Sequence, residues 1–102
     1  MSEYQLRYLP LFEQDVNAVK KYISATLKNP VAAMNLIEST DEAIIKRLES
    51  PLGYEPYHSV RERKYPYYRI YVGNYIIFYV VIGNVMEVRR FIYSKRNLSE
   101  HI

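Results

Sequence analysis

The chain of 102 residues contains no cysteine, no tryptophan and only three glycines. Without cysteine no disulfide can form, so nothing in the sequence points to an oxidising compartment. No apolar run approaches the ~20 residues that a membrane-spanning helix needs. The start of the chain, Met1-Ser2-Glu3, lacks the basic and apolar regions of a signal peptide. We therefore expect a cytoplasmic protein that contacts no membrane.

Signals for a cofactor are also missing. The glycines, Gly53, Gly73 and Gly83, are isolated and form no phosphate-binding loop. The histidines, His58 and His101, lie far apart and have no cysteine to help them, so no metal site is expected. We expect the protein to work without a cofactor or metal ion.

The composition fits one globular domain that spans residues 1–102. The chain is 49% hydrophobic and 25% charged, as ordinary folded domains are. Residues 1–50 carry six Lys and Arg against seven Asp and Glu, whereas residues 51–102 carry eight against four. The basic excess therefore lies in the second half, where it allows either a polyanion or an acidic protein as partner.

The first half predicts a strand and two helices. Residues 4–9 alternate apolar and polar side chains, as a short strand does. Pro10 suits the first position of a helix, whose apolar stripe continues to Leu27. Asn29 and Pro30 suit the cap and the first residue of a second helix, so a helical hairpin is expected. The apolar stripe of that second helix consists of Ala33, Met34, Ile37, Ile44, Ile45 and Leu48.

The second half predicts an antiparallel meander of three to four strands. The three clear β-type runs cover residues 67–72, 75–82 and 85–93, and a further short strand is expected near 57–63. The runs are joined by the turn sequences Gly73-Asn74 and Gly83-Asn84. The element order predicts an α+β domain in which the helices cover one sheet face. We expect the other face to remain open to solvent, a partner or a ligand.

Two segments carry a resemblance to a known family. Residues 68–79 read YRIYVGNYIIFY, and Arg90, Tyr93 and Arg96 follow at a spacing of three. Together with the helical hairpin they resemble the RelE/ParE superfamily of bacterial type II toxins, in the branch labelled plasmid stabilisation proteins. The resemblance covers nearly the whole chain. It implies a toxin held inactive in a hetero-oligomer with a cognate antitoxin, which we expect an adjacent reading frame to encode as an acidic protein.

The resemblance leaves the target open, because RelE-like members cut ribosome-bound mRNA and ParE-like members poison DNA gyrase. Our leading prediction is a metal-independent, ribosome-dependent mRNA endoribonuclease that inhibits translation. The alternatives are a non-enzymatic gyrase inhibitor and a toxin-fold protein that has lost toxicity. Whether the chain is an enzyme is not decided by the sequence.

RNA cleavage requires positive charge on the phosphate and groups that move protons. The candidate catalytic residues are Arg69, Arg90, Tyr93 and Arg96. The candidate nucleic-acid-binding residues are Lys95, Arg61, Arg63 and Lys64. We expect cations from separate strands to converge on one patch away from the helices. A tyrosine with a pKa near ~10 is a weak base at neutral pH unless cations depress that value.

Two departures from the RelE-like pattern weaken the nuclease interpretation. RelE-like nucleases often carry arginine where this chain has Ile76, and some relatives carry a His-Tyr pair where Tyr93-Ser94 stands. Structural roles also compete with the catalytic ones. The structural alternative for Arg69 is an ion pair with Glu87 across the meander. The structural alternative for Tyr93 is packing, which is the commoner role of a tyrosine.

Overall fold

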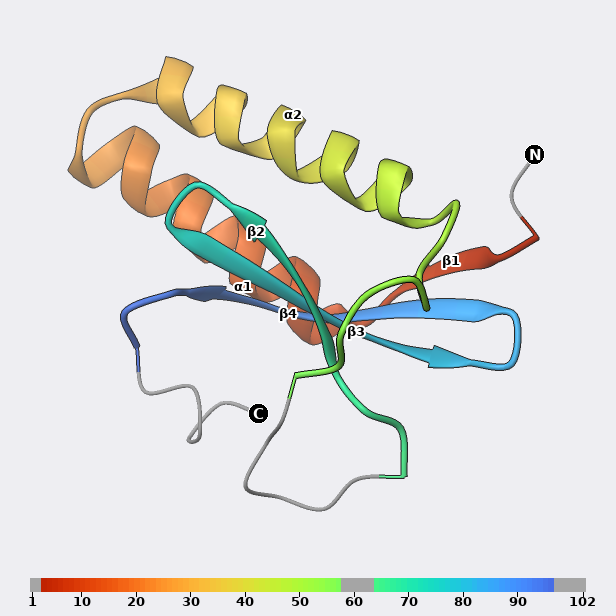
Figure 1. Cartoon of the computed structure of the whole chain (residues 1–102). Coiled ribbons are helices and arrows are strands. Elements are labelled where there is room, and N and C mark those ends of the chain that lie inside the picture. The colour runs from red at the N-terminus through yellow and green to blue at the C-terminus, as the bar shows by residue number, and fades with distance from the viewer. Residues whose placement is uncertain (1–2, 58–63, 97–102) are drawn as a thin grey trace.

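The protein is described by a computed structural model over residues 3–57 and 64–96. These residues form a sheet with two helices on one of its faces (Figure 1). The elements in chain order are β1 (Gln5–Tyr8), α1 (Pro10–Lys21), the π-helical turn η1 (Tyr22–Thr26), α2 (Pro30–Arg47), β2 (Tyr68–Val72), β3 (Tyr75–Ile82) and β4 (Val85–Tyr93). The predicted α+β architecture is confirmed. Neither α-helix of this described part is both long enough and apolar enough to cross a membrane.

The sheet has the strand order β1-β4-β3-β2. The meander β2-β3-β4 is antiparallel, as predicted. β1 joins it in parallel, with Gln5 opposite Val85 and Tyr8 opposite Val88. The periodicity of residues 4–9 predicted this strand but not its neighbour. Because β1 pairs with β4 only as far as Val88, the second half of β4 has an edge that β1 does not cover.

Both predicted hairpin turns are present. Gly73 and Gly83 have φ angles of +56° and +61°, whereas Asn74 and Asn84 do not have positive φ. Glycine with positive φ at the first central position is the pattern of a type II′ turn, whose twist matches that of the flanking strands. The Gly-Asn order therefore suits these two-residue connections.

The helices begin where the sequence predicts but do not end alike. The Asn29 side chain accepts a hydrogen bond from the Ala32 N–H at 3.0 Å and so caps α2. The first helix was expected to run unbroken to Leu27, yet α1 gives way to η1 after Lys21. In this turn the Ser24 hydroxyl donates to the Lys20 carbonyl at 2.7 Å, a bond that competes with regular helix geometry.

Apolar side chains pack on both faces of the sheet. The helix-facing cluster contains Phe12, Ile44, Tyr68, Ile70, Val72, Ile77, Tyr79, Met86, Val88 and Phe91. The opposite cluster contains Tyr67, Ile76, Phe78, Val80 and Ile92, with Tyr57, Tyr65 and Ile82 packed against it. The expectation of an open second face is therefore wrong. Since β3 is apolar on both of its sides, a second cover is needed, and the described residues around Tyr57 and Tyr67 supply part of it.

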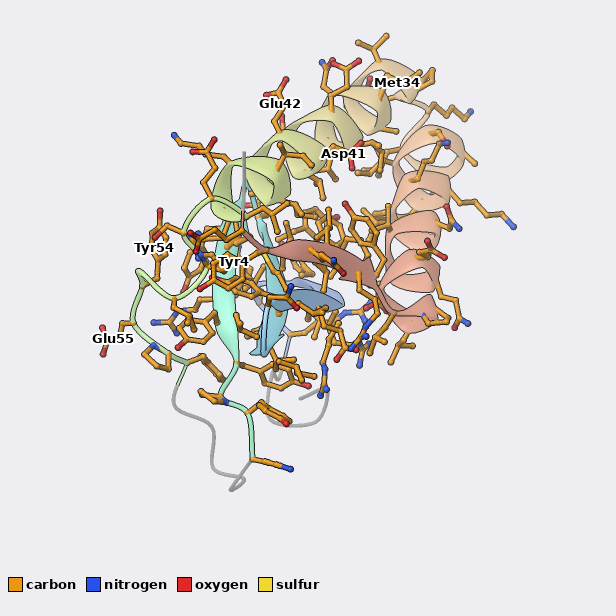
Figure 2. All side chains as sticks on the ribbon, turned by 90° about the vertical axis from the view of Figure 1, so that its right-hand side faces the viewer. Tyr4, Met34, Asp41, Glu42, Tyr54 and Glu55 are labelled. Carbon is orange, nitrogen blue, oxygen red and sulfur yellow. The ribbon has the colours of Figure 1, made fainter. Side chains whose placement is uncertain are left out.

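The second helix is less buried than its apolar stripe predicts. Ala33 and Ile44 are buried, but Met34 and Ile45 are 58% and 56% exposed. Met34 points away from the sheet in Figure 2. The buried stripe is narrower than the sequence predicts, because only one side of α2 contacts the sheet.

Glu87 of β4 links this strand to β1 through an ion pair with Arg7. Its carboxylate is almost buried and accepts hydrogen bonds from Arg7 Nε and Arg89 Nε, each at 2.9 Å. Burial opposes its ionisation, but the hydrogen bonds and charges of Arg89 and Arg7 outweigh that effect and lower the pKa of Glu87. The expected pairing of Glu87 with Arg69 is wrong, because Arg7 and Arg89 occupy this carboxylate.

We predict that Glu87 stabilises the fold only while it is ionised. A lowered folded-state pKa means that the stabilisation is present above the unfolded-state pKa and is lost as pH falls through the folded-state pKa. The free energy of unfolding can be measured with urea from about pH 7 to about pH 3. The native protein should be more stable than Glu87→Gln, and this difference should be largest at neutral pH and shrink as the pH falls. The exposed Glu38→Gln is the control. A pH-independent difference for Glu87→Gln would contradict the prediction.

Candidate functional site

Arg69 lies on the sheet face that turns away from the helices. It sits opposite Phe78, which belongs to the cluster on that face. Its guanidinium carbon is 5.2 Å from the ring centre of Tyr57 and 5.7 Å from that of Tyr71. Its neighbours in β2, Tyr68 and Ile70, point toward the helices, so strand alternation fixes this placement.

Arg90 is held by a carboxylate of the first helix. Its Nε donates to Asp15 Oδ2 at 2.8 Å and its Nη2 donates to Asp15 Oδ1 at 3.1 Å. Asp15 Oδ2 also accepts the Phe91 backbone N–H at 3.0 Å. Asp15 thus supplies a hydrogen-bond acceptor for the Phe91 N–H, in the part of β4 that does not pair with β1. The bidentate pair neutralises Arg90, which stabilises the fold and leaves little charge for a phosphate.

Tyr93 and Arg96 lie on the opposite side of the sheet from Arg69. Tyr93 sits opposite Tyr75, with ring centres 5.7 Å apart, and Tyr75 stacks on Phe91 at 4.8 Å. Both Tyr75 and Phe91 pack in the helix-facing cluster. Arg96 is exposed, and its backbone N–H donates to the Tyr93 carbonyl at 3.0 Å in the turn after β4.

These two residues line a groove of about 800 Å³ between the first helix and the ends of β3 and β4. Its apolar lining is Ala18, Val19, Tyr22, Ile23, Leu27, Ala32, Tyr75, Phe91 and Tyr93. Its polar lining is Asp15, Asn29, Asn74 and Arg96. We call this surface the helix–strand groove. It combines exposed aromatic and aliphatic side chains with one arginine at its rim.

The sequence does not predict the helical wall of the groove. Tyr22 and Leu27 are 52% and 55% exposed, although the sequence predicts that Leu27 belongs to the apolar stripe of the core. The available signal was the length of that stripe, which continues past the point where the helix can still reach the sheet. An apolar residue beyond that point is a candidate for contact with a partner.

The groove is poorly equipped for proton transfer. Burial raises the pKa of Tyr75, the adjacent Tyr93 and Tyr22 raise it further, and Arg96 only partly offsets them. Tyr75 is therefore protonated at neutral pH and takes no proton from a ribose hydroxyl. The described residues include no histidine.

The expected convergence of cations on one patch away from the helices is wrong. Arg69 faces one side of the sheet, Arg96 and Tyr93 face the helical side, and Arg90 is bound to Asp15. Lys95 is exposed, and Lys64 lies 5.5 Å from the ring centre of Tyr65. Arg61 and Arg63 lie outside the described residues. A role in nucleic-acid binding stays a prediction for all of these cations.

The sequence of this chain matches a known toxin family. The family described as "ParE toxin of type II toxin-antitoxin system, parDE" matches residues 6–98. The chain belongs to the ParE toxin family. The predicted RelE/ParE resemblance is confirmed, whereas the plasmid stabilisation label stays a prediction.

A solved structure supports the same fold for this ParE-family chain. "Chromosomal ParDE TA system from P. aeruginosa" is similar with a TM-score of 0.72 at 12% sequence identity. The similarity covers 91% of this chain and 98% of that chain. At such low identity the similarity shows the fold alone. A search of curated proteins found no match.

We predict that Asp15 is worth more to stability than an ordinary helix carboxylate. Asp15→Ala should lower the free energy of unfolding by about 2 kcal/mol, because it removes the acceptor of two Arg90 hydrogen bonds and of the Phe91 N–H bond. Asp15→Asn should cost less, since an amide oxygen can still accept one bond. Urea unfolding measures both, with the exposed Glu38→Ala as control. Equal stability of Asp15→Ala and Glu38→Ala would show that this contact does not hold the helix.

Proposed function

We propose that this ParE-family protein is a toxin that inhibits DNA gyrase by binding to it, without chemistry of its own, and that a cognate antitoxin neutralises it. The observation that carries this proposal is the separation of the residues named for RNA cleavage. Arg69 and Arg96 face opposite sides of the sheet, and Arg90 is neutralised by Asp15. A transition-state phosphate needs its cations on one side.

The helix–strand groove suits contact with a protein. Exposed tyrosine, leucine and arginine side chains surround a concave surface, and interfaces are enriched in tyrosine and arginine. Arg96 at the rim makes no ion pair with any described residue, so its guanidinium can donate hydrogen bonds to a carboxylate of a partner. We assign the contact with gyrase to this groove.

RNA cleavage remains a second candidate because of the face that carries Arg69. There Tyr57, Tyr71 and Lys64 accompany Arg69, and rings beside cations suit single-stranded nucleic acid. That face supplies electrostatic attraction without a described group whose pKa suits it to accept a proton. We therefore rank it second.

The two candidates separate in one set of measurements. Purified toxin should inhibit supercoiling by gyrase, and induced cells should show intact mRNA ends. Arg96→Ala should weaken inhibition by about tenfold, the loss expected for an interface arginine worth about 1.4 kcal/mol. Arg69→Ala should remain toxic. Lys46→Ala, which removes an exposed cation outside the groove, is the matched control.

A different outcome would reject the proposal. Gyrase that still supercoils DNA at saturating toxin concentration would reject gyrase inhibition. In-frame mRNA cuts that disappear in a folded Arg69→Ala variant would also reject it and would support the endoribonuclease instead. Circular dichroism of each variant shows whether the fold is retained.

A further inference from the structure

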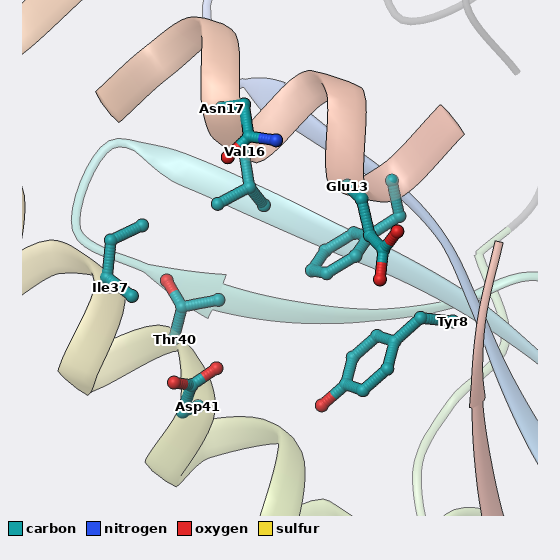
Figure 3. A pocket seen from close by; sticks show the side chains of 8 residues that line it. Tyr8, Glu13, Val16, Asn17, Ile37, Thr40 and Asp41 are labelled. Carbon is teal, nitrogen blue, oxygen red and sulfur yellow. The ribbon is translucent and has the colours of Figure 1, made fainter. Parts of the chain in front are cut away.

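A second cavity lies between the two helices, on the other side of α1 from the helix–strand groove. It has a volume of about 340 Å³ (Figure 3). It is lined by Tyr8, Phe12, Glu13, Val16, Asn17, Ile37, Thr40 and Asp41. We call it the interhelical pocket. None of these residues lines the helix–strand groove, and none was named as a site residue from the sequence.

The interhelical pocket carries two carboxylates without a compensating cation. Glu13 comes from α1 and Asp41 from α2, and neither of their exposed carboxylates forms a hydrogen bond or ion pair with any residue that the structure describes. The lining contains no lysine or arginine. In Figure 3 the hydroxyl end of Tyr8 is turned to the side of the pocket on which Asp41 lies. Burial raises the pKa of Tyr8, and the charges of Asp41 and Glu13 raise it further, so both carboxylates act on the same phenol.

The floor of the interhelical pocket is aromatic. Tyr8 and Phe12 stack with ring centres 5.4 Å apart and an interplanar angle of 18°. Phe12 is only 5% exposed, so the stack is fixed by the core. Tyr8 is 36% exposed, so its ring and the two carboxylates can together attract an organic cation, through the π-face and through charge. A metal ion is a poor fit, because no three metal-ligating side chains come together within the described residues.

The size of the pocket suits one long side chain. A volume of about 340 Å³ corresponds to roughly eleven water molecules in the liquid. An arginine fits best, because its planar guanidinium can stack on a ring and still donate to carboxylates at its edge. A lysine would fulfil the charge requirement with weaker stacking.

We propose that the interhelical pocket binds an arginine or lysine side chain of the cognate antitoxin. This inference rests on the proposed function, since it assumes an antitoxin. The occupant is assigned from the position of the pocket. Glu13, Val16 and Asn17 lie on one side of α1, whereas Asp15, Ala18 and Val19 lie on the other and line the groove.

A segment anchored in the pocket has a short path to the groove. Half the circumference of a helix about 10 Å wide is about 16 Å, and an extended chain advances about 3.3 Å per residue, so about five residues pass around α1. Such a segment would cover the surface assigned to gyrase contact. Binding a cation in the pocket would thus help to neutralise the toxin, even if the antitoxin is acidic as a whole.

The test measures the affinity of the antitoxin encoded beside the toxin gene. Titration calorimetry compares native toxin with Glu13→Gln, Asp41→Asn and the double variant, which keep side-chain size and remove charge. Each single variant should weaken binding by about tenfold and the double variant by more, with a smaller loss at high salt. Glu42→Gln is the matched control, because Glu42 adjoins Asp41 in sequence and points away from α1 (Figure 2). Its affinity should stay within about twofold of native.

A second measurement identifies the occupying residue. Each lysine and arginine of the antitoxin is replaced by glutamine and tested against native and doubly substituted toxin. Replacing the residue that occupies the pocket should weaken binding to native toxin much more than binding to the doubly substituted toxin. In NMR spectra the ring resonances of Tyr8 should shift when native antitoxin binds. They should shift less when the bound antitoxin carries glutamine in place of the occupying residue.

Three outcomes would overturn the inference. One is antitoxin affinity of the double variant within about twofold of native. Another is a loss of gyrase inhibition in the double variant with unchanged antitoxin affinity, which would assign the pocket to the target. The third is no binding between native toxin and antitoxin, which would reject the antitoxin part of the proposed function too. Only this last outcome affects both proposals, so the two failures are distinguishable.

Discussion

The contact of Asp15 with β4 is the interaction on which the functional surfaces depend. One carboxylate accepts two bonds from the Arg90 guanidinium and one from the Phe91 backbone. This fixes α1 along the half of β4 that β1 leaves uncovered. The helix–strand groove and the interhelical pocket lie on the two sides of that helix, so the position of both follows from the same contact.

Two neighbouring arginines of the second half, Arg89 and Arg90, form ion pairs with carboxylates inside the fold. Arg89 shares Glu87 with Arg7, and Arg90 is bound to Asp15. The first half supplies a comparable case: Arg47 makes no ion pair with a described residue and instead donates to the Arg69 carbonyl and the Tyr79 hydroxyl. Of the arginines that the sequence predicts as a phosphate-binding set, Arg90 therefore holds the first helix on the sheet instead. Arg96 is the arginine that remains available at the groove, and this favours a protein-binding toxin over a nuclease.

Burial on both sheet faces explains why Arg69 and Arg96 are separated. The residues of β3 are apolar on both sides, so each face needs a cover. The helices cover one face, and Tyr57 and Tyr67 pack on the other. Arg69 reaches the second face among these tyrosines, where its charge lies over aromatic rings. No common site with the groove can form, because the sheet itself lies between them.

The sequence by itself determined the elements, because their signals are local. Asn29 and Pro30 start the second helix, Gly73 and Gly83 supply the positive φ of the turns, and apolar periodicity marks the strands. The family could also be recognised, since its motif lies on consecutive strands and turns. Only the tertiary structure decided that β1 runs parallel to β4 and that Glu87 and Asp15 take the arginines. These contacts join residues up to 80 positions apart, and no periodicity specifies which carboxylate meets which cation. The same holds for the groove and the pocket, because concave surfaces exist only once the helices have packed on the sheet.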